Sequence, residues 1–451
     1  MKPSKFNIVQ TYNGNILIYN TFTTAMVEMG EEDYKDIFVK EEYGKHEEVN
    51  QLIELGFLIG DECNESLEQE RLRKEVIDSS SDKIANIIIA PTLECNAHCF
   101  YCFENGFRKG KMSIETADRL VDYLQEHWNG EKLGITWFGG EPLLAADIID
   151  RIIDKLRIKK INFSSKITTN GSLLNKEMIS RIKAGWNTDK IQITIDALEE
   201  EYNNIKKYDN LNNAFQTVID NVQEALYAGF NIKVRINFDP MKQEKALKTL
   251  EYLNDKFERN SNLKVYFAPI DEDNNVVKNI ANSFPEYSEH PYISLIKFGR
   301  QHGLYRGFPD MEDESLDHGE YDVYGFLKKL KIYPSPTNCY ATCPNVYSID
   351  CNGKIYKCHR ALGREEYASG DIFTGIQKNE IFNFFCNTEV MYEECKDCSV
   401  LPICQGGCKI NAKFYHGKEA CVPSKAIIKE LILLYKKDLE QMEGGERNEN
   451  C

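Results

Sequence analysis

Three cysteines within one short segment have the spacing of a metal-cluster site. Cys95, Cys99 and Cys102 are separated by three and by two residues. Thiolates at these positions can hold three corners of a four-iron cluster, which normally takes four cysteine ligands. The fourth iron would then lack a protein ligand, and an open metal position is where chemistry can occur. A zinc site is the alternative, with His98 as a fourth ligand.

A second group of cysteines lies near the end of the chain at short, fixed spacings. Their order is Cys339-x3-Cys343-x9-Gly353-x4-Cys358, followed by Cys395-x2-Cys398-x5-Cys404-x3-Cys408-x12-Cys421. Such bunching indicates metal or cluster ligation rather than a disulfide framework, which is rare in cytosolic proteins. Zinc is the alternative for the four cysteines from 395 to 408, because paired thiolates also suit that ion. The remaining Cys63, Cys386 and Cys451 have no spacing partner and are predicted to be ordinary thiols.

Four further features with polar or glycine residues follow predicted strands. They are Trp137–Pro142, which reads Trp-Phe-Gly-Gly-Glu-Pro, then Thr168–Gly171, Ile193–Ala197 and Arg235. Two adjacent glycines let the backbone approach a ligand closely. Taken alone, these features could instead be a plain turn, an Asn-Gly turn, a helix cap at Asp196 and a salt-bridged arginine.

The elements that must position these residues follow from alternating apolar and amphipathic segments between residue 84 and about 310. Strands are predicted at 84–91, 133–138, 166–169, 190–195, 231–238 and 263–269. Helices are predicted near 115–128, 144–157, 175–184, 212–228 and 243–257. Such strand–helix repeats favour a parallel α/β sheet. Barrels of this kind place their chemistry at the carboxyl ends of the strands, where the segments above lie.

The two ends of the chain have different patterns. Residues 1 to about 80 predict a small separate unit. Its strands at 7–12 and 16–19 flank Asn13-Gly14-Asn15, a hairpin signal, and short helices near 31–38 and 47–55 follow, with a return strand at 57–59. The charged residues 66–82 predict a linker or an exposed helix. Residues 424–441 predict a closing helix, and the tail from 444 is expected to be disordered.

The cysteine triad after the apolar run at 84–90, combined with Gly139-Gly140-Glu141 after the second strand, resembles the radical S-adenosylmethionine (SAM) superfamily. The resemblance implies a partial (β/α)6 barrel in which SAM binds the open iron. It implies SAM contacts from the matching positions, which are Tyr101, Gly139, Gly140, Glu141, Thr169, Asn170 and Asp196. Many relatives carry an arginine after the fourth strand that pairs with the SAM carboxylate. Here Tyr202–Lys207 offers lysines instead, and Arg235 is another candidate.

The C-terminal pattern resembles the SPASM domain of radical SAM peptide maturases, which carries two auxiliary four-iron clusters. The resemblance implies Cys339, Cys343, Cys358 and Cys408 as ligands of the first cluster, and Cys395, Cys398, Cys404 and Cys421 as ligands of the second. With the triad, this gives three [4Fe-4S] clusters. The Cys339-x3-Cys343 spacing is tighter than is common in that domain, and Cys351 lies nearby. One of these three could therefore be a spectator, which would leave an open iron.

The N-terminal pattern resembles the winged-helix-like leader-peptide recognition element of peptide-modifying enzymes, with a purely structural extension as the alternative. The predicted organisation is therefore a recognition element at 1–80, a radical SAM partial barrel at 84–310, a SPASM domain at 311–443 and a tail at 444–451.

Together the resemblances imply a radical SAM enzyme that cleaves SAM reductively to a 5′-deoxyadenosyl radical. Its implied partners are a ribosomally made precursor peptide with an N-terminal leader and an electron donor such as flavodoxin or ferredoxin. The leading hypothesis for the product is a thioether between a Cys sulfur and a carbon. A carbon–carbon crosslink, an epimerisation and a side-chain oxidation as in sulfatase maturases are alternatives. A non-catalytic iron–sulfur electron carrier is an alternative of another class.

Composition excludes several other functions. The formal net charge of −16 would repel nucleic acid phosphates. The N-terminus lacks the apolar run of a signal peptide, and no stretch reaches the roughly 20 apolar residues that cross a bilayer. We therefore expect a cytoplasmic protein that binds neither nucleic acid nor membrane.

Overall fold

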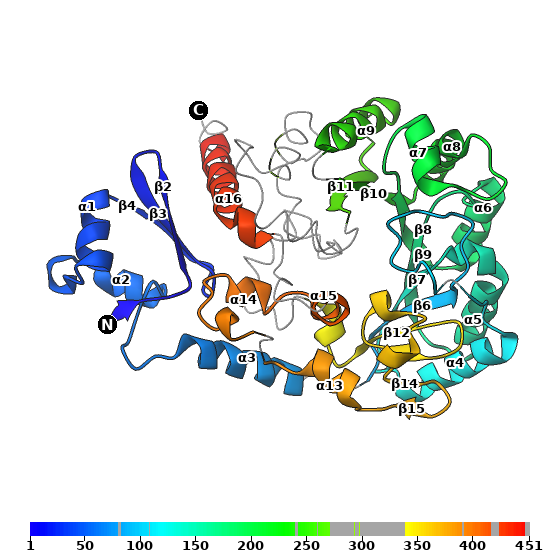
Figure 1. The fold of residues 1–451 in the computed structure, drawn as a ribbon, viewed down its shortest axis with the longest axis horizontal. Helices are drawn as coiled ribbons and strands as arrows, with labels where there is room; N and C mark the ends of the chain where they lie inside the picture. The colour runs from blue at the N-terminus through cyan, green and yellow to red at the C-terminus, as the bar shows by residue number, and fades with distance from the viewer. Residues whose placement is uncertain are drawn as a thin grey trace.

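The computed structural model describes residues 1–79, 83–107, 109–239, 242–258, 260–270, 293, 297, 339–389, 392–415 and 424–446. An N-terminal sheet with short helices lies on one side, and an α/β region lies on the other (Figure 1). Short C-terminal elements lie between the two, and helix α3 (Glu65–Ser79) runs along the lower edge in this view.

The α/β region is built on an eight-stranded sheet in the order β11-β10-β9-β8-β7-β6-β12-β13. Its successive parallel strands are β6 (Asn86–Thr92), β7 (Leu133–Gly139), β8 (Phe163–Thr169), β9 (Thr188–Thr194), β10 (Asn231–Phe238) and β11 (Leu263–Pro269). The helices are α4 (Ile114–His127), η3 (Pro142–Ala145), α5 (Ala146–Ile158), α6 (Lys176–Gly185), α7 (Glu199–Lys206), α8 (Ala214–Tyr227) and α9 (Gln243–Lys256). The six predicted strands and five predicted helices are confirmed, whereas α7 was not predicted.

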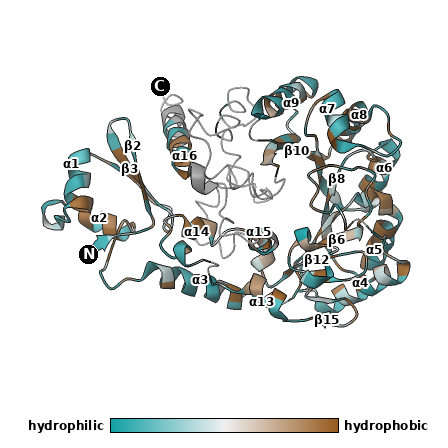
Figure 2. Ribbon diagram, in the orientation of Figure 1, coloured by the Kyte–Doolittle hydropathy of each residue, from teal (hydrophilic) through white to brown (hydrophobic). Residues whose placement is uncertain are grey.

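Local sequence explains these elements. The strands β7 and β8 alternate buried and half-buried residues along their length. Ser113 and Asn175 begin α4 and α6 as N-caps, because their side-chain oxygens accept the backbone N–H of Thr116 and Met178. Helices α5 and α6 each carry both hydrophobic and hydrophilic residues (Figure 2), as expected for amphipathic helices that pack on a sheet.

Two strands from the C-terminal region complete the sheet. Strand β12 (Val346–Ile349) pairs in parallel with β6, and β13 (Ile355–Tyr356) pairs antiparallel to β12. All four residues of β12 are buried. The cysteine-rich region is thus joined to the barrel sheet beside the strand that leads into the Cys95 loop.

The N-terminal sheet has the order β2-β3-β4, formed by β2 (Asn7–Tyr12), β3 (Asn15–Asn20) and β4 (Met26–Met29). The predicted hairpin is confirmed: Asn13 and Gly14 have φ angles of 49° and 87°, as a two-residue type I′ turn requires. The other elements are β1 (Lys2–Pro3), α1 (Glu31–Tyr34), η1 (Lys35–Val39), η2 (Tyr43–Lys45), α2 (Val49–Glu54) and β5 (Leu58–Ile59).

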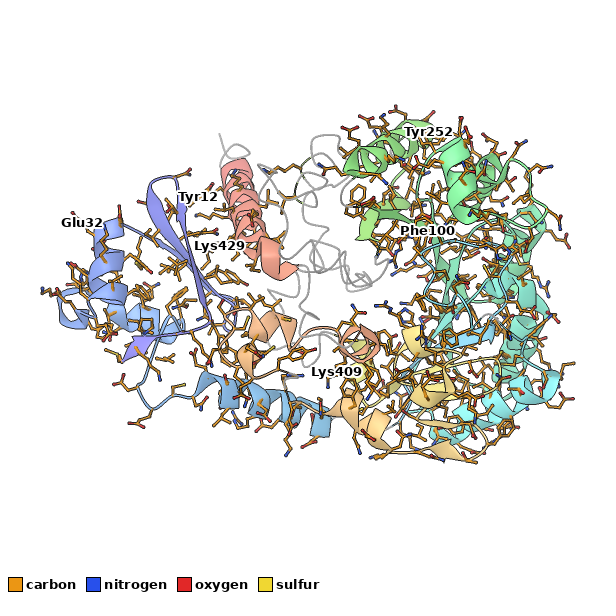
Figure 3. All side chains as sticks on the ribbon, in the orientation of Figure 1. Tyr12, Glu32, Phe100, Tyr252, Lys409 and Lys429 are labelled. Carbon is orange, nitrogen blue, oxygen red and sulfur yellow. The ribbon has the colours of Figure 1, made fainter. Side chains whose placement is uncertain are left out.

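Both faces of this sheet are covered. Ile18 lies in a core with residues of η1 and α2. On the opposite face, Leu17 and Tyr19 pack in a core with Leu431 and Ile432 of α16 (Ser424–Glu446). Tyr12 at the end of β2 donates to Glu440 of α16 at 2.6 Å (Figure 3). The N-terminal unit therefore packs against the closing helix of the chain.

The C-terminal region consists of short elements. They are η5 (Tyr340–Thr342), η6 (His359–Ala361), η7 (Glu365–Tyr367), β14 (Gly370–Asp371), β15 (Gly375–Ile376), α13 (Glu380–Cys386), η8 (Glu393–Cys395), α14 (Leu401–Cys404), α15 (Lys409–Tyr415) and α16. The closing helix is confirmed but continues to Glu446, so the tail predicted from 444 begins with helical residues. Residues 447–451 and most of 271–338 lie outside the described residues.

In the parts of the chain that the structure describes, we find no helix with the length and apolar character needed to cross a bilayer.

Candidate functional site

The Cys95 loop leaves the carboxyl end of β6 and is held by backbone hydrogen bonds. The N–H of His98 donates to Lys206 O at 2.7 Å, and Asn96 O accepts from Asp209 at 2.9 Å. Cys95, Cys99 and Cys102 are partly exposed, and among the described residues they form no disulfide. Among the described residues, no three Cys, His, Asp or Glu side chains gather closely enough to hold a single metal ion.

The Gly-Gly-Glu turn packs directly on this loop. A Cβ on Gly139 would lie 2.2 Å from Thr92 O, and one on Gly140 would lie 2.2 Å from Glu94 O. The N–H of Glu141 donates to Glu94 O at 2.8 Å. Only glycine permits this approach, because any side chain would collide with the backbone that precedes Cys95.

The Glu141 carboxylate joins the ends of β7 and β8. It is fully buried and accepts from Leu143 N at 3.0 Å, Asn170 N at 2.8 Å and Thr169 Oγ1 at 2.8 Å. Burial raises the pKa of Glu141 to about 7, although these hydrogen bonds oppose the rise. With its oxygens engaged in this way, the side chain fixes the relative position of the two strand ends.

Asn170 connects the third strand to the first cysteine. Its Nδ2 donates to Asn96 Oδ1 at 2.9 Å and lies 3.8 Å from Cys95 Sγ. Its Oδ1 accepts from the N–H and hydroxyl of Ser172 at 2.9 and 2.7 Å. An amide donor beside a cluster thiolate is one of the means by which proteins tune iron–sulfur sites.

Tyr101, Asp196 and Lys206 form a buried polar cluster. Lys206 Nζ lies 2.8 Å from Asp196 Oδ2 and donates to the Tyr101 hydroxyl at 2.9 Å. The same Asp196 oxygen accepts from Tyr101, and the other accepts from Asn237 N and Nδ2 at 3.0 and 2.9 Å. Burial lowers the pKa of Lys206, but Asp196 and Tyr101 outweigh it and raise that pKa well above its usual value. Lys206 is thus held in an ion pair with Asp196.

Arg235 lies on β10 and points to the same side of the strand as Asn237. Its Nε donates to Asn237 Oδ1 at 2.7 Å. Within the described residues it makes no ion pair, so the salt bridge weighed as its alternative role is not seen there. Phe100, between Cys99 and Tyr101, is half exposed at the edge of the barrel (Figure 3).

The structure gathers most of the first predicted auxiliary set. Cys339 and Cys358 lie near the half-buried Tyr340 and raise its pKa, and Cys408 lies near Cys358. Cys343 lies close to Cys386 of α13, a thiol that the sequence analysis set aside. Sequence spacing could not place Cys386 here, because α13 folds back onto η5 through tertiary contacts.

Cys351 lies elsewhere. Its Sγ is buried against the barrel, 3.7 Å from Lys109 O and 3.2 Å from the Cβ position of Gly110. Burial raises its pKa to about 11, which keeps the thiol neutral. Of the second predicted set, Cys395, Cys398 and Cys404 lie around α14, and Cys421 is outside the described residues.

Aromatic rings connect the two cysteine regions. Phe103, directly after Cys102, stacks on Phe138 at 6.4 Å between centroids, and His359, directly after Cys358, lies 4.8 Å from Phe138. His359 stacks on Tyr340, whose hydroxyl lies 3.9 Å from Cys358 Sγ. Phe138 lies in the Trp137–Pro142 motif, and Phe103 and His359 each follow a cysteine in the sequence, but no pattern predicted that these rings would meet.

Comparison with known proteins identifies the α/β region. Residues 89–255 match the model of the Radical SAM superfamily. The chain carries a radical SAM domain. An uncharacterized protein of Methanocaldococcus jannaschii is 35% identical over 121 residues, which cover 26% of this chain and 41% of that one. The chain thus spans less than half the length of that relative.

Other proteins match over larger parts of the chain. The radical SAM cyclopropyl synthase TigE of Paramaledivibacter caminithermalis is 22% identical, and the match covers 94% of each chain. SuiB of Streptococcus suis, solved bound to its precursor peptide SuiA, is 16% identical with a TM-score of 0.51 and covers 94% of this chain and 99% of that one. The enzyme anSMEcpe, solved with bound AdoMet, is 17% identical with a TM-score of 0.58 over 78% and 99% of the two chains. The two solved structures share the fold of this chain.

Proposed function

We propose that this protein modifies a ribosomally made precursor peptide by radical SAM chemistry. The observation that carries the proposal is that one chain contains an N-terminal sheet, a radical SAM barrel and a cysteine-rich region. The cysteine-rich C-terminal part packs against both the sheet and the barrel. As domains we propose residues 1–80, 84–310 and 311–443 for these three parts.

The residues at the mouth of the barrel fit a SAM-binding cluster. Cys95, Cys99 and Cys102 would hold it, because they are partly exposed, form no disulfide within the described residues and lie on one loop against Gly139 and Gly140. When bound, the cluster and SAM supply a 5′-deoxyadenosyl radical that removes hydrogen from an unactivated carbon.

This chain's own residues would bind and orient SAM. Gly139 and Gly140 allow the turn to pack closely on the cysteine loop, and its backbone carbonyls would bind the amino group of SAM. Tyr101, Thr169, Asn170 and Asp196 would line the rest of the SAM site. Glu141 holds the two strand ends in register through Thr169 and Asn170. Because Lys206 is paired with Asp196, we assign the SAM carboxylate to Arg235 rather than to a lysine of residues 202–207.

The auxiliary cysteines would bind two further clusters, in the sets Cys339, Cys343, Cys358, Cys408 and Cys395, Cys398, Cys404, Cys421. Since Cys351 is buried against the barrel, we assign it no ligand role. The rings of Phe103, Phe138 and His359 bring the two cysteine regions into contact. We place the reacting part of the peptide beside these rings, between the two regions.

The N-terminal sheet offers a place for a leader. Strand β4 is at the edge of the sheet and, in the described part of the chain, pairs only with β3. An extended peptide can add to such an edge as a further strand. SuiB, which shares the fold along its length, was solved with its precursor peptide bound.

Met26→Pro should weaken leader binding about tenfold, whereas Met26→Ala should not. Asn20 N donates to Ala25 O, so the alternation of an antiparallel ladder turns the Met26 N–H to the outer edge. Both substitutions remove the methionine side chain, and only proline also removes that N–H. Fluorescence anisotropy with a labelled leader measures the difference. Equal affinities of the two variants would exclude strand addition at β4.

For the bond formed, we propose a thioether between a Cys sulfur and a carbon of the peptide. The carbon loses its hydrogen atom to the adenosyl radical, the thiol loses its proton, and closure releases one electron, which an auxiliary cluster would accept. The product is therefore lighter by two hydrogens. Full-length similarity to the cyclopropyl synthase TigE favours a carbon–carbon bond as the second candidate.

The test uses the reconstituted protein, SAM, a flavodoxin or ferredoxin donor and a Cys-containing precursor peptide, sought among the short reading frames that flank the gene. We expect loss of two hydrogens and loss of alkylation of the peptide Cys by iodoacetamide. Loss of two hydrogens with the Cys still alkylated would favour the carbon–carbon bond. An unchanged peptide alongside continued SAM cleavage would contradict the function.

A further inference from the structure

Three buried cationic side chains surround the predicted auxiliary cysteines. Lys357 precedes Cys358 and is 0% exposed, and Lys409 follows Cys408 and is 7% exposed. Arg73 of α3 is 5% exposed, and its guanidinium lies close enough to Cys404 for an electrostatic interaction with that thiol. Lys and Arg are rarely buried unless paired, so this arrangement needs a cause.

Lys409 is the most informative of the three (Figure 3). Its Nζ donates to the carbonyls of Phe384 at 2.9 Å, Phe385 at 3.1 Å and Asn387 at 2.8 Å, and to Asn387 Oδ1 at 2.7 Å. These acceptors lie at the carboxyl end of α13 and carry no full charge. Among the described residues, no carboxylate forms an ion pair with Lys409.

Lys357 and Arg73 also donate to backbone carbonyls, and Glu70 lies near Arg73. Lys357 Nζ donates to Cys343 O at 2.6 Å and Val346 O at 2.8 Å, and lies 4.2 Å from the centre of the Tyr347 ring. Arg73 Nη1 donates to Thr388 O at 3.0 Å, while its buried Nε has no hydrogen-bond partner.

Burying a cation without a counter-charge is unfavourable. Of the groups near Lys409 that can carry negative charge, Glu389 is exposed to water, whereas Cys339 and Cys386 are only partly exposed. A cluster on the auxiliary cysteines, with its sulfides and thiolates, would supply a much larger negative charge.

We propose that Lys409, supported by Lys357 and Arg73, is a fixed counter-charge for the auxiliary clusters. A buried ammonium stabilises the state with one more electron over the oxidised state, because Coulomb attraction grows with cluster charge and is weakly screened in the interior. Lys409 thus raises the reduction potential of the first auxiliary cluster and makes it the better electron acceptor. This role rests on the proposed function, which supplies the cluster.

The test is a redox titration of the anaerobically reconstituted full-length protein, followed by electron paramagnetic resonance. The signal that changes on addition of SAM marks the SAM-binding cluster, and the other signals are auxiliary. Lys409→Gln should lower the midpoint reduction potential of one auxiliary cluster by about 59 mV, which is a tenfold change in the equilibrium constant for taking up one electron. Lys409→Arg should keep the wild-type value. Lys413→Gln, one helical turn along α15, is the matched control and should also keep it.

Each outcome decides the proposal. Loss of auxiliary iron in Lys409→Gln but not in Lys409→Arg would also support a counter-charge. An unchanged midpoint in Lys409→Gln, or equal loss of iron in both Lys409 variants, would overturn it and indicate a packing role. A wild-type protein without auxiliary iron would overturn the auxiliary-cluster assignment itself, which separates the two failures.

Discussion

Replacing Cys95, Cys99 and Cys102 together by alanine is expected to abolish SAM cleavage while leaving auxiliary iron bound. No other described cysteine is placed to substitute, because Cys351 is turned into the barrel and the remaining C-terminal thiols lie around Tyr340 and α14. Iron content should fall by one cluster, and no 5′-deoxyadenosine should form under reducing conditions. Chromatography of the product and iron analysis measure both quantities.

Cys63→Ala is the matched control for the triple variant. Cys63 is exposed, lies on the N-terminal unit and should be dispensable for both iron binding and SAM cleavage. Continued formation of 5′-deoxyadenosine by the triple variant would show that SAM is cleaved elsewhere. Loss of all iron would show that the auxiliary cysteines do not hold clusters independently.

Lys206→Met is expected to destabilise the barrel by about 3–5 kcal/mol, the cost of leaving one partner of a buried ion pair uncompensated. Lys206 and Asp196 side chains are 2% and 0% exposed, so water cannot replace the lost ammonium. The three tryptophans, Trp128, Trp137 and Trp186, all lie in the α/β region, so their fluorescence during urea unfolding reports its stability.

Lys207→Gln is the control, since this neighbouring lysine is exposed. It should unfold like the wild type. A Lys206→Met protein as stable as the wild type would mean that Lys206 is not held by Asp196. Its side chain would then be available for SAM, as the sequence first suggested.

Features set by local sequence were predictable. The apolar runs of β6 to β11 and the polar residues that follow them fixed the barrel strands and brought Glu141, Thr169 and Asn170 to one edge of the sheet. The Asn13-Gly14 hairpin was predictable for the same reason, since a two-residue turn leaves few alternatives. The cysteine spacings identified the segments that meet around Tyr340.

Features set by contacts between distant segments were not predictable. The run Val346–Ile349 is apolar, but nothing in it indicates that it pairs with β6 rather than within its own region. The cover that α16 gives the N-terminal sheet, and the placing of Cys386 beside Cys343, likewise depend on tertiary packing. Periodicity identifies Leu17 and Leu431 as buried residues, but it does not show that they pack in the same core.

The central claim is that the loop from Cys95 to Cys102 binds a four-iron cluster whose open iron takes SAM. The most direct measurement is electron paramagnetic resonance of the reduced, anaerobic wild-type protein before and after SAM is added. The account predicts a four-iron signal that changes on addition of SAM and is absent from the triple alanine variant. A spectrum that SAM leaves unaltered, or zinc bound at these three cysteines, would contradict it.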